Sequence, residues 1–282
     1  MARMPPEIQG GKFMVVQHNL RAMNSNRMLG LTQSTQAKAT EKLSSGYKIN
    51  RAADDAAGLA ISEKMRRQIR GLSQASENAQ DGISCVQTAE GALNEVHDML
   101  QRMNELATQA ANGTNTNTDR GYLQQEVTQL AEEITRTATN TTFNEQTLLD
   151  ADKDLTLQVG TESGHEITFS LKQMDAATLG VDAVDISTSA GAKTALGLVK
   201  TAIESVSSLR ADLGATQNRL EHTINNLDNV VENTTAAESQ IRDTDMASEM
   251  VKYSNNNILA QAGQAMLAQS NQANQGVLSL LQ

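Results

Sequence analysis

Residues 93–113 read LNEVHDMLQRMNELATQAANG. Apolar side chains recur in this stretch at alternating spacings of three and four residues. That spacing places them on one stripe of an α-helix, and it is typical of helices that pack side by side along a seam. The pair Asn112-Gly113 ends the pattern. The stretch predicts a long helix with this seam: Leu93, Val96, Leu100, Met103, Ala107 and Ala110.

Helical patterns also precede and follow this stretch. A first helix is predicted over residues 20–43, closed at Ser44-Ser45-Gly46 because Gly46 adopts the left-handed conformation readily. A second helical stretch is expected to start near Asn50 as its N-cap, with Asp54 and Asp55 in its early turns. After the polar loop 114–119, a further helix is predicted over residues 121–139. The absence of proline from Met14 onward favours long uninterrupted helices.

The middle of the chain has a different periodicity. Apolar residues alternate with polar ones over 155–159 and again over 167–171, and the loop 160–164 between them contains two glycines. This pattern predicts a β-hairpin. Residues 172–190 are expected to be irregular.

From about Ala192 the helical pattern returns. One further seam is Leu213, Leu220, Ile224, Leu227 and Val231, and a last amphipathic segment carries Leu259, Ala262, Met266, Ala273, Val277 and Leu280. The fold class predicted is mainly α: an elongated antiparallel helical rod with coiled-coil-like terminal helices and a small β-hairpin in the middle of the chain. Both ends of the chain are expected at the same pole.

The composition agrees with thin helical seams. The chain of 282 residues has three Phe, three Tyr and no Trp, too few aromatic side chains for a thick globular core. Its net charge of −10 gives no basic footprint for nucleic acid. The basic run at residues 64–70 is interpreted as a solvated helix face, with an anionic partner as the alternative. No signal peptide or membrane-spanning stretch is recognised, and the single Cys85 excludes an intramolecular disulfide.

Short motifs near both ends resemble those of bacterial flagellin. They are Leu43-Ser44-Ser45-Gly46, Ile49-Asn50 and the run from Asp54 to Ile61, then Gln101-Arg102 through Asn112-Gly113-Thr114, and finally Ala273-Asn274-Gln275 with the tail from Val277 to Leu281. The resemblance covers nearly everything after Met14. Its assembly signature falls here on Leu43, Gly46, Asn50, Asp54, Asp55, Gly58, Leu59, Ile61, Val277, Leu280 and Leu281.

The resemblance implies a structural subunit of the flagellar filament, located outside the cell. Such a subunit is exported unfolded, polymerises with copies of itself through paired terminal helices, and meets an export chaperone, a cap protein and hook-junction proteins. The short middle of this chain implies a minimal member without large outer domains. No nucleic acid or membrane partner is implied.

Four parts of the chain are expected. Residues 1–13 are interpreted as a non-native or mis-called extension, with Met14 as the true start. Residues 14–55 and 243–282 form a terminal helical inner-tube domain. Residues 56–150 and 191–242 form a helical rod, and residues 151–190 hold the hairpin and the irregular segment. The terminal helices have thin seams, so we expect them to become ordered only in the polymer.

The resemblance also implies recognition by an innate immune receptor of the Toll-like class. The family's recognition surface falls on Arg102, Leu106 and Glu126 in this sequence. An arginine beside an apolar residue on one helix face is suited to an interface. The alternative is that this face packs against neighbouring subunits, and Asn104 stands where the family often has arginine.

Enzymatic motifs fail in this sequence. His165-Glu166 begins like the zinc motif HExxH, but Phe169 occupies the position of the second histidine. Gly191-Ala192-Lys193-Thr194 ends like a phosphate-binding loop, but Ile186 occupies the position of its first glycine. We expect no enzyme, no catalytic or metal site and no cofactor. The alternatives to a filament subunit are the hook–filament junction protein of the same system and a secreted adhesin.

Overall fold

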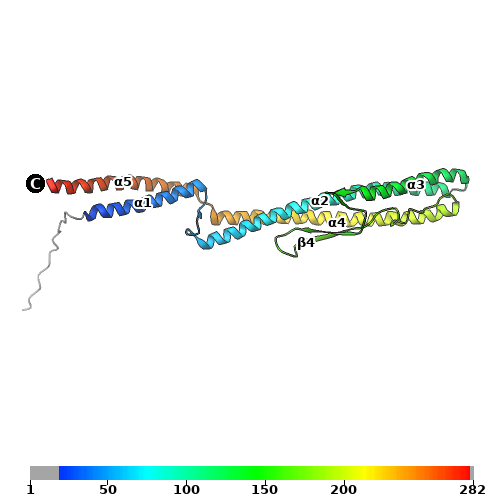
Figure 1. Ribbon diagram of the computed structural model, residues 1–282, viewed down its shortest axis with the longest axis horizontal. Coiled ribbons are helices and arrows are strands. Elements are labelled where there is room, and N and C mark those ends of the chain that lie inside the picture. The colour runs from blue at the N-terminus through cyan, green and yellow to red at the C-terminus, as the bar shows by residue number, and fades with distance from the viewer. Residues whose placement is uncertain (1–18, 280–282) are drawn as a thin grey trace, which may run out of the picture. The chain divides into compact units, whose positions relative to one another are not determined.

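The computed structural model describes residues 19–279, with side chains placed through Ala273. It is mainly helical, as the sequence predicted, and it contains small hairpins (Figure 1). The helices are α1 (Leu20–Ser45), α2 (Ala56–Ala111), α3 (Asn117–Asn140), α4 (Ser189–Arg242) and α5 (Met246–Ser279), and the strands are β1 (Thr142–Phe143), β2 (Gln146–Thr147), β3 (Lys153–Gln158) and β4 (Glu166–Leu171).

The chain divides into two compact units. The terminal unit comprises the chain up to Lys64 and from Ala237 onward, and the rod unit comprises Met65–Ala236. Helices α2 and α4 contribute residues to both. The expected extension at residues 1–13, and Leu280 and Leu281 of the expected assembly signature, lie outside the described residues.

The rod unit is built on the predicted seams. All six seam residues of α2 between Leu93 and Ala110 are buried, and they share one apolar core with α3, α4 and the segments between them. Helices α2 and α4 run antiparallel, because Ser76 bonds to Asp228 at 3.2 Å while Glu90 lies 3.8 Å from Arg210 further along. The antiparallel return of the chain is therefore confirmed in this unit.

The turn between α2 and α3 is held by a buried arginine. Arg120 donates from Nε to the carbonyl of Ala110 at 2.8 Å and from a terminal nitrogen to that of Asn112 at 3.1 Å, so it satisfies carbonyls left free at the end of α2. Thr116 and Asp119 form a capping box that starts α3. Helix α3 thus begins at Asn117, four residues before the expected start, because the cap takes in part of the polar loop.

The predicted hairpin is present, and a second one was missed. Strands β3 and β4 pair antiparallel, with Leu157 opposite Ile167. The missed hairpin joins β1 to β2 through Asn144 and Glu145, which have φ angles of 48° and 65°. Two successive left-handed residues are typical of a two-residue hairpin turn. Residues 172–188 contain no helix or strand, as expected.

In the terminal unit, α1 and α5 lie side by side and antiparallel (Figure 1). At one end the Asn19 side chain donates to the carbonyl of Ser270 at 3.3 Å. At the other end the Thr244 amide donates to the carbonyl of Gly46 at 3.0 Å, and Tyr47 forms a β-bridge with Asp243. The predicted pairing of the first and last helices is confirmed.

One expected helix start is wrong. Asn50 is not the N-cap of α2, which begins only at Ala56. Asp55 stands immediately before it and accepts a hydrogen bond from the Gly58 amide at 2.9 Å, which is the role of an N-cap side chain. Asn50 lies instead in the preceding linker and donates to the carbonyl of Tyr47 at 3.1 Å. The linker therefore takes in the residues 51–55 that were assigned to a helix.

Candidate assembly surface

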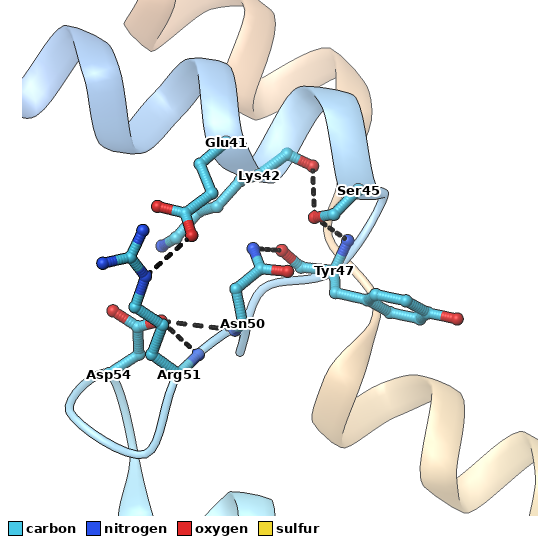
Figure 2. A network of polar contacts seen from close by, with 7 residues as sticks. All are labelled: Glu41, Lys42, Ser45, Tyr47, Asn50, Arg51 and Asp54. Atoms are coloured by element: carbon cyan, nitrogen blue, oxygen red, sulfur yellow. Dashed lines mark hydrogen bonds and ion pairs between the residues drawn. The ribbon is translucent and has the colours of Figure 1, made fainter.

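The linker of residues 46–55 is fixed by polar contacts within itself and with the end of α1 (Figure 2). Gly46 has φ 76° and donates its amide to the carbonyl of Lys42 at 2.9 Å, so it closes α1 as predicted. Ser45 accepts from the amide of Tyr47 at 3.1 Å. The chain thereby leaves the helix in one defined direction.

Asp54 organises the second half of the linker. Its carboxylate accepts from the backbone amide of Arg51 at 3.0 Å and from that of Asn50 at 3.2 Å (Figure 2). These bonds, the one from Arg51 first, hold the pKa of the Asp54 carboxyl below its ordinary value. The Arg51 side chain in turn lies 2.9 Å from Glu41 on α1, at an exposed position where an ion pair contributes little.

Gly58 is required by the way the linker packs. The Ile49 side chain is buried, with 3% of its surface exposed. A Cβ added at Gly58 would stand 2.8 Å from Ile49 Cδ1 and 2.5 Å from the Asp55 carboxylate. Glycine therefore lets Ile49 and the capping carboxylate sit against the first turn of α2.

A cluster around Arg242 was missed by the sequence reasoning. Its side chain is only 14% exposed, lies 2.7 Å from Glu63 and covers the ring of Tyr47 at 4.7 Å from the centroid. Its carbonyl accepts from the Lys48 amide at 2.6 Å. The cluster joins the linker, the start of α2 and the end of α4. Glu63 is 179 residues away from Arg242 in the sequence, and Tyr47 and Lys48 are further away still, so no local pattern could have shown the cluster.

The seam between α1 and α5 also follows heptad spacing but is filled differently from the seams of the rod. Its shielded positions carry mostly small or polar side chains. These positions are Ala22, Ser25, Leu29, Thr32, Gln36, Ala39 and Leu43 on α1, and Glu249, Tyr253, Asn256, Ala260, Gly263, Leu267 and Ser270 on α5. A seam of this composition buries little apolar surface.

Most of the larger apolar side chains of the terminal unit lie outside this seam. Leu259 and Met266 of the predicted stripe on α5 are both exposed, Leu259 by 57%. They therefore do not pack against α1 as seam residues would. Among the described residues, fifteen large hydrophobic side chains are exposed, and twelve belong to the terminal unit: Leu20, Met23, Met28, Leu31, Tyr47, Ile61, Met246, Met250, Val251, Ile258, Leu259 and Met266.

A groove runs along one edge of the α1–α5 pair. It has a volume of about 320 Å³ and is lined by Met28 and Leu29 from α1 and by Leu259, Gly263 and Met266 from α5. Leu29 seats against Gly263, where an added Cβ would lie 3.3 Å from Leu29 Cδ1. The groove is apolar and open, so it can receive an apolar side chain.

The remaining signature residues are divided between packing and exposure. Leu43 and Leu59 are half-buried, and Ile61 is exposed. Val277 lies within α5, but its side chain is outside the described part of the structure. The signature therefore combines residues that shape the linker with apolar residues that the subunit leaves uncovered.

The three receptor candidates lie in the rod unit. Arg102 Nε contacts a Glu126 carboxylate oxygen at 2.8 Å, and Arg102 also lies 3.0 Å from Glu105. The hydrogen bond that Arg102 donates to Glu126 is the main reason why the pKa of the Arg102 guanidinium is raised. Leu106 is 1% exposed and belongs to the apolar core. The structure thus places Arg102 and Glu126 together on the surface and Leu106 beneath it.

Within residues 19–279, no group of three or more His, Cys, Asp or Glu side chains is placed to hold a metal ion. His165 and His222 line a separate groove of the rod unit with Glu162. None of the described helices combines the length and apolar character needed to cross a membrane.

Comparison with known proteins identifies the family. The family model of the bacterial flagellin N-terminal helical region matches residues 16–154, and that of the C-terminal helical region matches residues 196–281. A flagellin of Halalkalibacterium halodurans is 55% identical over 271 residues, which cover 95% of this chain and 100% of that protein. A flagellar filament 31.3 kDa core protein of Treponema maltophilum is 47% identical over 286 residues, with the same two coverages.

Among solved structures, the crystal structure of Bacillus cereus flagellin aligns with a TM-score of 0.47 at 35% identity. That alignment covers 54% of this chain and 88% of the other. The two family models together cover both helical ends of the sequence, in the order in which the resemblance placed them. On the strength of the two family models and the two relatives, the chain belongs to the bacterial flagellin family of structural proteins.

Proposed function

We infer that the chain is the structural subunit of a bacterial flagellar filament, a homopolymer outside the cell that serves motility. The observation that carries this function is the exposed apolar surface of the terminal unit, where twelve large hydrophobic side chains lie outside the α1–α5 seam. A soluble monomer rarely exposes apolar side chains in such a concentration without an interaction site.

Polymerisation supplies the burial that the single subunit lacks. Fully burying one Leu, Ile or Met side chain contributes about 1.5–3 kcal/mol. Several such side chains per subunit, covered by neighbouring copies, offset the loss of translational and rotational freedom on assembly. The filament is therefore stabilised mainly by contacts that the subunit cannot make alone.

The ordering of the terminal helices in the filament is part of this proposal. The α1–α5 seam is small and polar, which supports a pair that gains its stability from neighbouring copies. Hydrogen exchange on the dilute subunit tests it. Residues 20–45 and 246–279 should exchange rapidly in the subunit and slowly in filaments, while the α2 seam is protected in both.

The same exposed apolar surface supports a proposal about the proteins that bind the subunit during export. We propose that the chain leaves the cell unfolded and that a chaperone covers α5 beforehand, because Ile258 and Leu259 are exposed there. The cap and hook-junction proteins are proposed to contact the terminal unit of the first and last subunits. A pull-down of the chaperone should lose binding when residues 243–282 are deleted.

Recognition by a Toll-like receptor is proposed at Arg102, Glu126 and Leu106. The exposed Arg102–Glu126 pair supports it as a charged surface feature. Arg102→Ala should weaken activation of receptor-bearing cells. Arg136→Ala is the matched control, since Arg136 forms a similar exposed pair with Glu133 on α3. Leu106→Ala removes a side chain from the core, so its effect on receptor activation must be compared with its effect on the thermal unfolding of the subunit.

Electron microscopy of the purified subunit under salting-out conditions tests the main function. Long helical filaments are expected from the full chain, and none from a chain lacking residues 243–282, whose rod unit should still show cooperative unfolding. Short rings from the full chain would support a hook–filament junction protein instead. A stable monomer under all conditions would support a secreted binding module.

A further inference from the structure

The methionines of this protein are unevenly distributed. The described residues include nine, and the five of the terminal unit are all between 49% and 62% exposed: Met23, Met28, Met246, Met250 and Met266. In the rod unit, Met103 and Met174 are buried, and Met65 and Met99 are half-buried. Exposed methionine residues are therefore concentrated on the surface that the proposed function covers with neighbouring copies.

Two of these methionines line the same apolar groove from different helices. Met28 comes from α1 and Met266 from α5, and Leu259 of α5 lines the same groove. Methionine suits such a surface because its unbranched side chain adapts to an irregular neighbour. The same side chain becomes polar when its sulfur gains an oxygen. A groove that must receive an apolar side chain is sensitive to this change.

We propose that these five methionines are a peroxide-sensitive modification site that controls assembly, an inference that rests on the proposed filament function. The thioether sulfur attacks one oxygen of hydrogen peroxide, the O–O bond breaks, a sulfur–oxygen bond forms, and the second oxygen leaves as water. Sulfur is oxidised by two electrons and peroxide is reduced by two. The free subunit is oxidised and excluded from the filament, whereas assembled subunits are shielded by their neighbours.

The thiol of the single cysteine does not compete with this chemistry. Cys85 is buried in the rod core, and desolvation raises the pKa of its thiol. A buried thiol with little thiolate reacts slowly with peroxide. Oxidation at limiting peroxide is therefore directed to the terminal unit, and methionine sulfoxide reductases can reverse it.

The first test maps oxidation by mass spectrometry. The dilute subunit and intact filaments are treated with limiting hydrogen peroxide, and peptides carrying each methionine are quantified. In the subunit, the five terminal methionines should convert before Met103 and Met174. In filaments their conversion should be slower by about tenfold or more, as expected for burial of an exposed site. Conversion at equal rates in subunit and filament would overturn the proposal.

The second test measures assembly. Oxidised subunit should need a concentration about tenfold higher to polymerise, with unchanged thermal unfolding of the rod, and reductase treatment should restore it. Replacing all five methionines by leucine conserves volume and should give filaments insensitive to peroxide. Met103→Leu with Met174→Leu is the control, and it should stay as sensitive as the parent.

A variant with only two substitutions keeps the test possible if the protein with all five replacements does not fold or assemble. Met28→Leu with Met266→Leu changes only the groove and should remove part of the peroxide effect. Normal polymerisation of oxidised parent protein, or full sensitivity of both leucine variants, would overturn the modification site while leaving the filament function intact. Failure of the untreated parent to form filaments would instead overturn the proposed function itself.

Discussion

The rod unit and the terminal unit use the same three-four spacing to bring helices together, but they fill their seams with different side chains. In the rod, the α2 seam carries residues such as Leu93, Val96 and Leu100, all buried. In the terminal unit, the corresponding positions carry residues such as Ser25 and Thr32. The spacing decides where two helices meet, and the size of the side chains decides how much stability the contact contributes.

This difference separates two tasks within one chain. The rod completes its own core, so its stability belongs to the subunit. The terminal unit keeps most of its large apolar side chains outside the seam, so much of its burial depends on other copies. Equal truncations in the two units should therefore affect different measurements.

The largest effect is expected from Leu93→Ala in the rod. Leu93 is fully buried, and removing a buried leucine side chain costs about 2–5 kcal/mol because of lost transfer energy and the cavity left behind. Urea unfolding of the subunit, followed by circular dichroism, measures it. Leu198→Ala is the matched control, since Leu198 is exposed on α4 of the same unit and should cost little. Equal losses of unfolding free energy at both positions would contradict the expected difference between a buried and an exposed leucine.

A smaller effect on a different observable is expected from Leu259→Ala. The unfolding midpoint of the subunit should stay nearly unchanged because Leu259 is exposed. The concentration needed for polymerisation should rise by roughly tenfold or more, from about 1.5–3 kcal/mol of lost burial between copies. Sedimentation of filaments over a series of protein concentrations measures this. A lowered unfolding midpoint with unchanged assembly would show that Leu259 packs within the subunit.

Leu259 also shows the limit of sequence-based prediction here. The stripe of Leu259, Ala262 and Met266 has the correct spacing for a seam, and so does the stripe of Ala260, Gly263 and Leu267 one residue further on. The first stripe is the more hydrophobic one and was therefore predicted to be the seam, but the residues of the second stripe face α1. When the partner helix supplies little apolar surface, only the fold decides which of two equally spaced stripes is buried.

Elsewhere, a feature could be predicted when the residues that form it lie close together in the sequence. The rod seams, the closure of α1 at Gly46 and the β3–β4 hairpin depend on neighbouring residues, and all were predicted correctly. The start of α2 was misplaced because Asn50 and Asp55 are both good capping residues. The Arg242 cluster joins residues far apart in sequence, and no periodic pattern reports such a contact.

The linker offers a sharper test through Gly58→Ala. The added Cβ would lie 2.5 Å from the Asp55 carboxylate and 2.8 Å from Ile49 Cδ1, so these two side chains must move, Asp55 from its N-cap bond and Ile49 from its buried packing, at a cost of about 1–3 kcal/mol. Faster hydrogen exchange of linker amides, with rod amides unchanged, is the expected result. Gly91→Ala is the control, because Gly91 lies in α2 with open space around it. There, alanine should stabilise the helix by about 0.5–1 kcal/mol.

The smallest effect is expected from lowering the pH. This experiment allows one carboxylate of the terminal unit to be compared with one of the rod unit. The pKa of Asp54 is lowered chiefly by the Arg51 amide, and that of Asp119 chiefly by the Thr116 hydroxyl. A carboxyl with a lowered pKa in the folded state contributes stability above its ordinary pKa and loses it as pH falls through the folded value. Both contributions should therefore fade below about pH 4.

The two sites should nevertheless respond differently to that loss. The α2–α3 turn is also held by the buried Arg120, so its amides should stay protected in acid. The linker depends on Asp54 for the amides of Asn50 and Arg51, so their exchange, corrected for intrinsic rates, should accelerate below pH 4. In Asp54→Asn this acceleration should disappear, because the amide side chain does not titrate in that range. Unchanged pH dependence in Asp54→Asn would mean that the linker is held by α1 and α5 rather than by its own carboxylate.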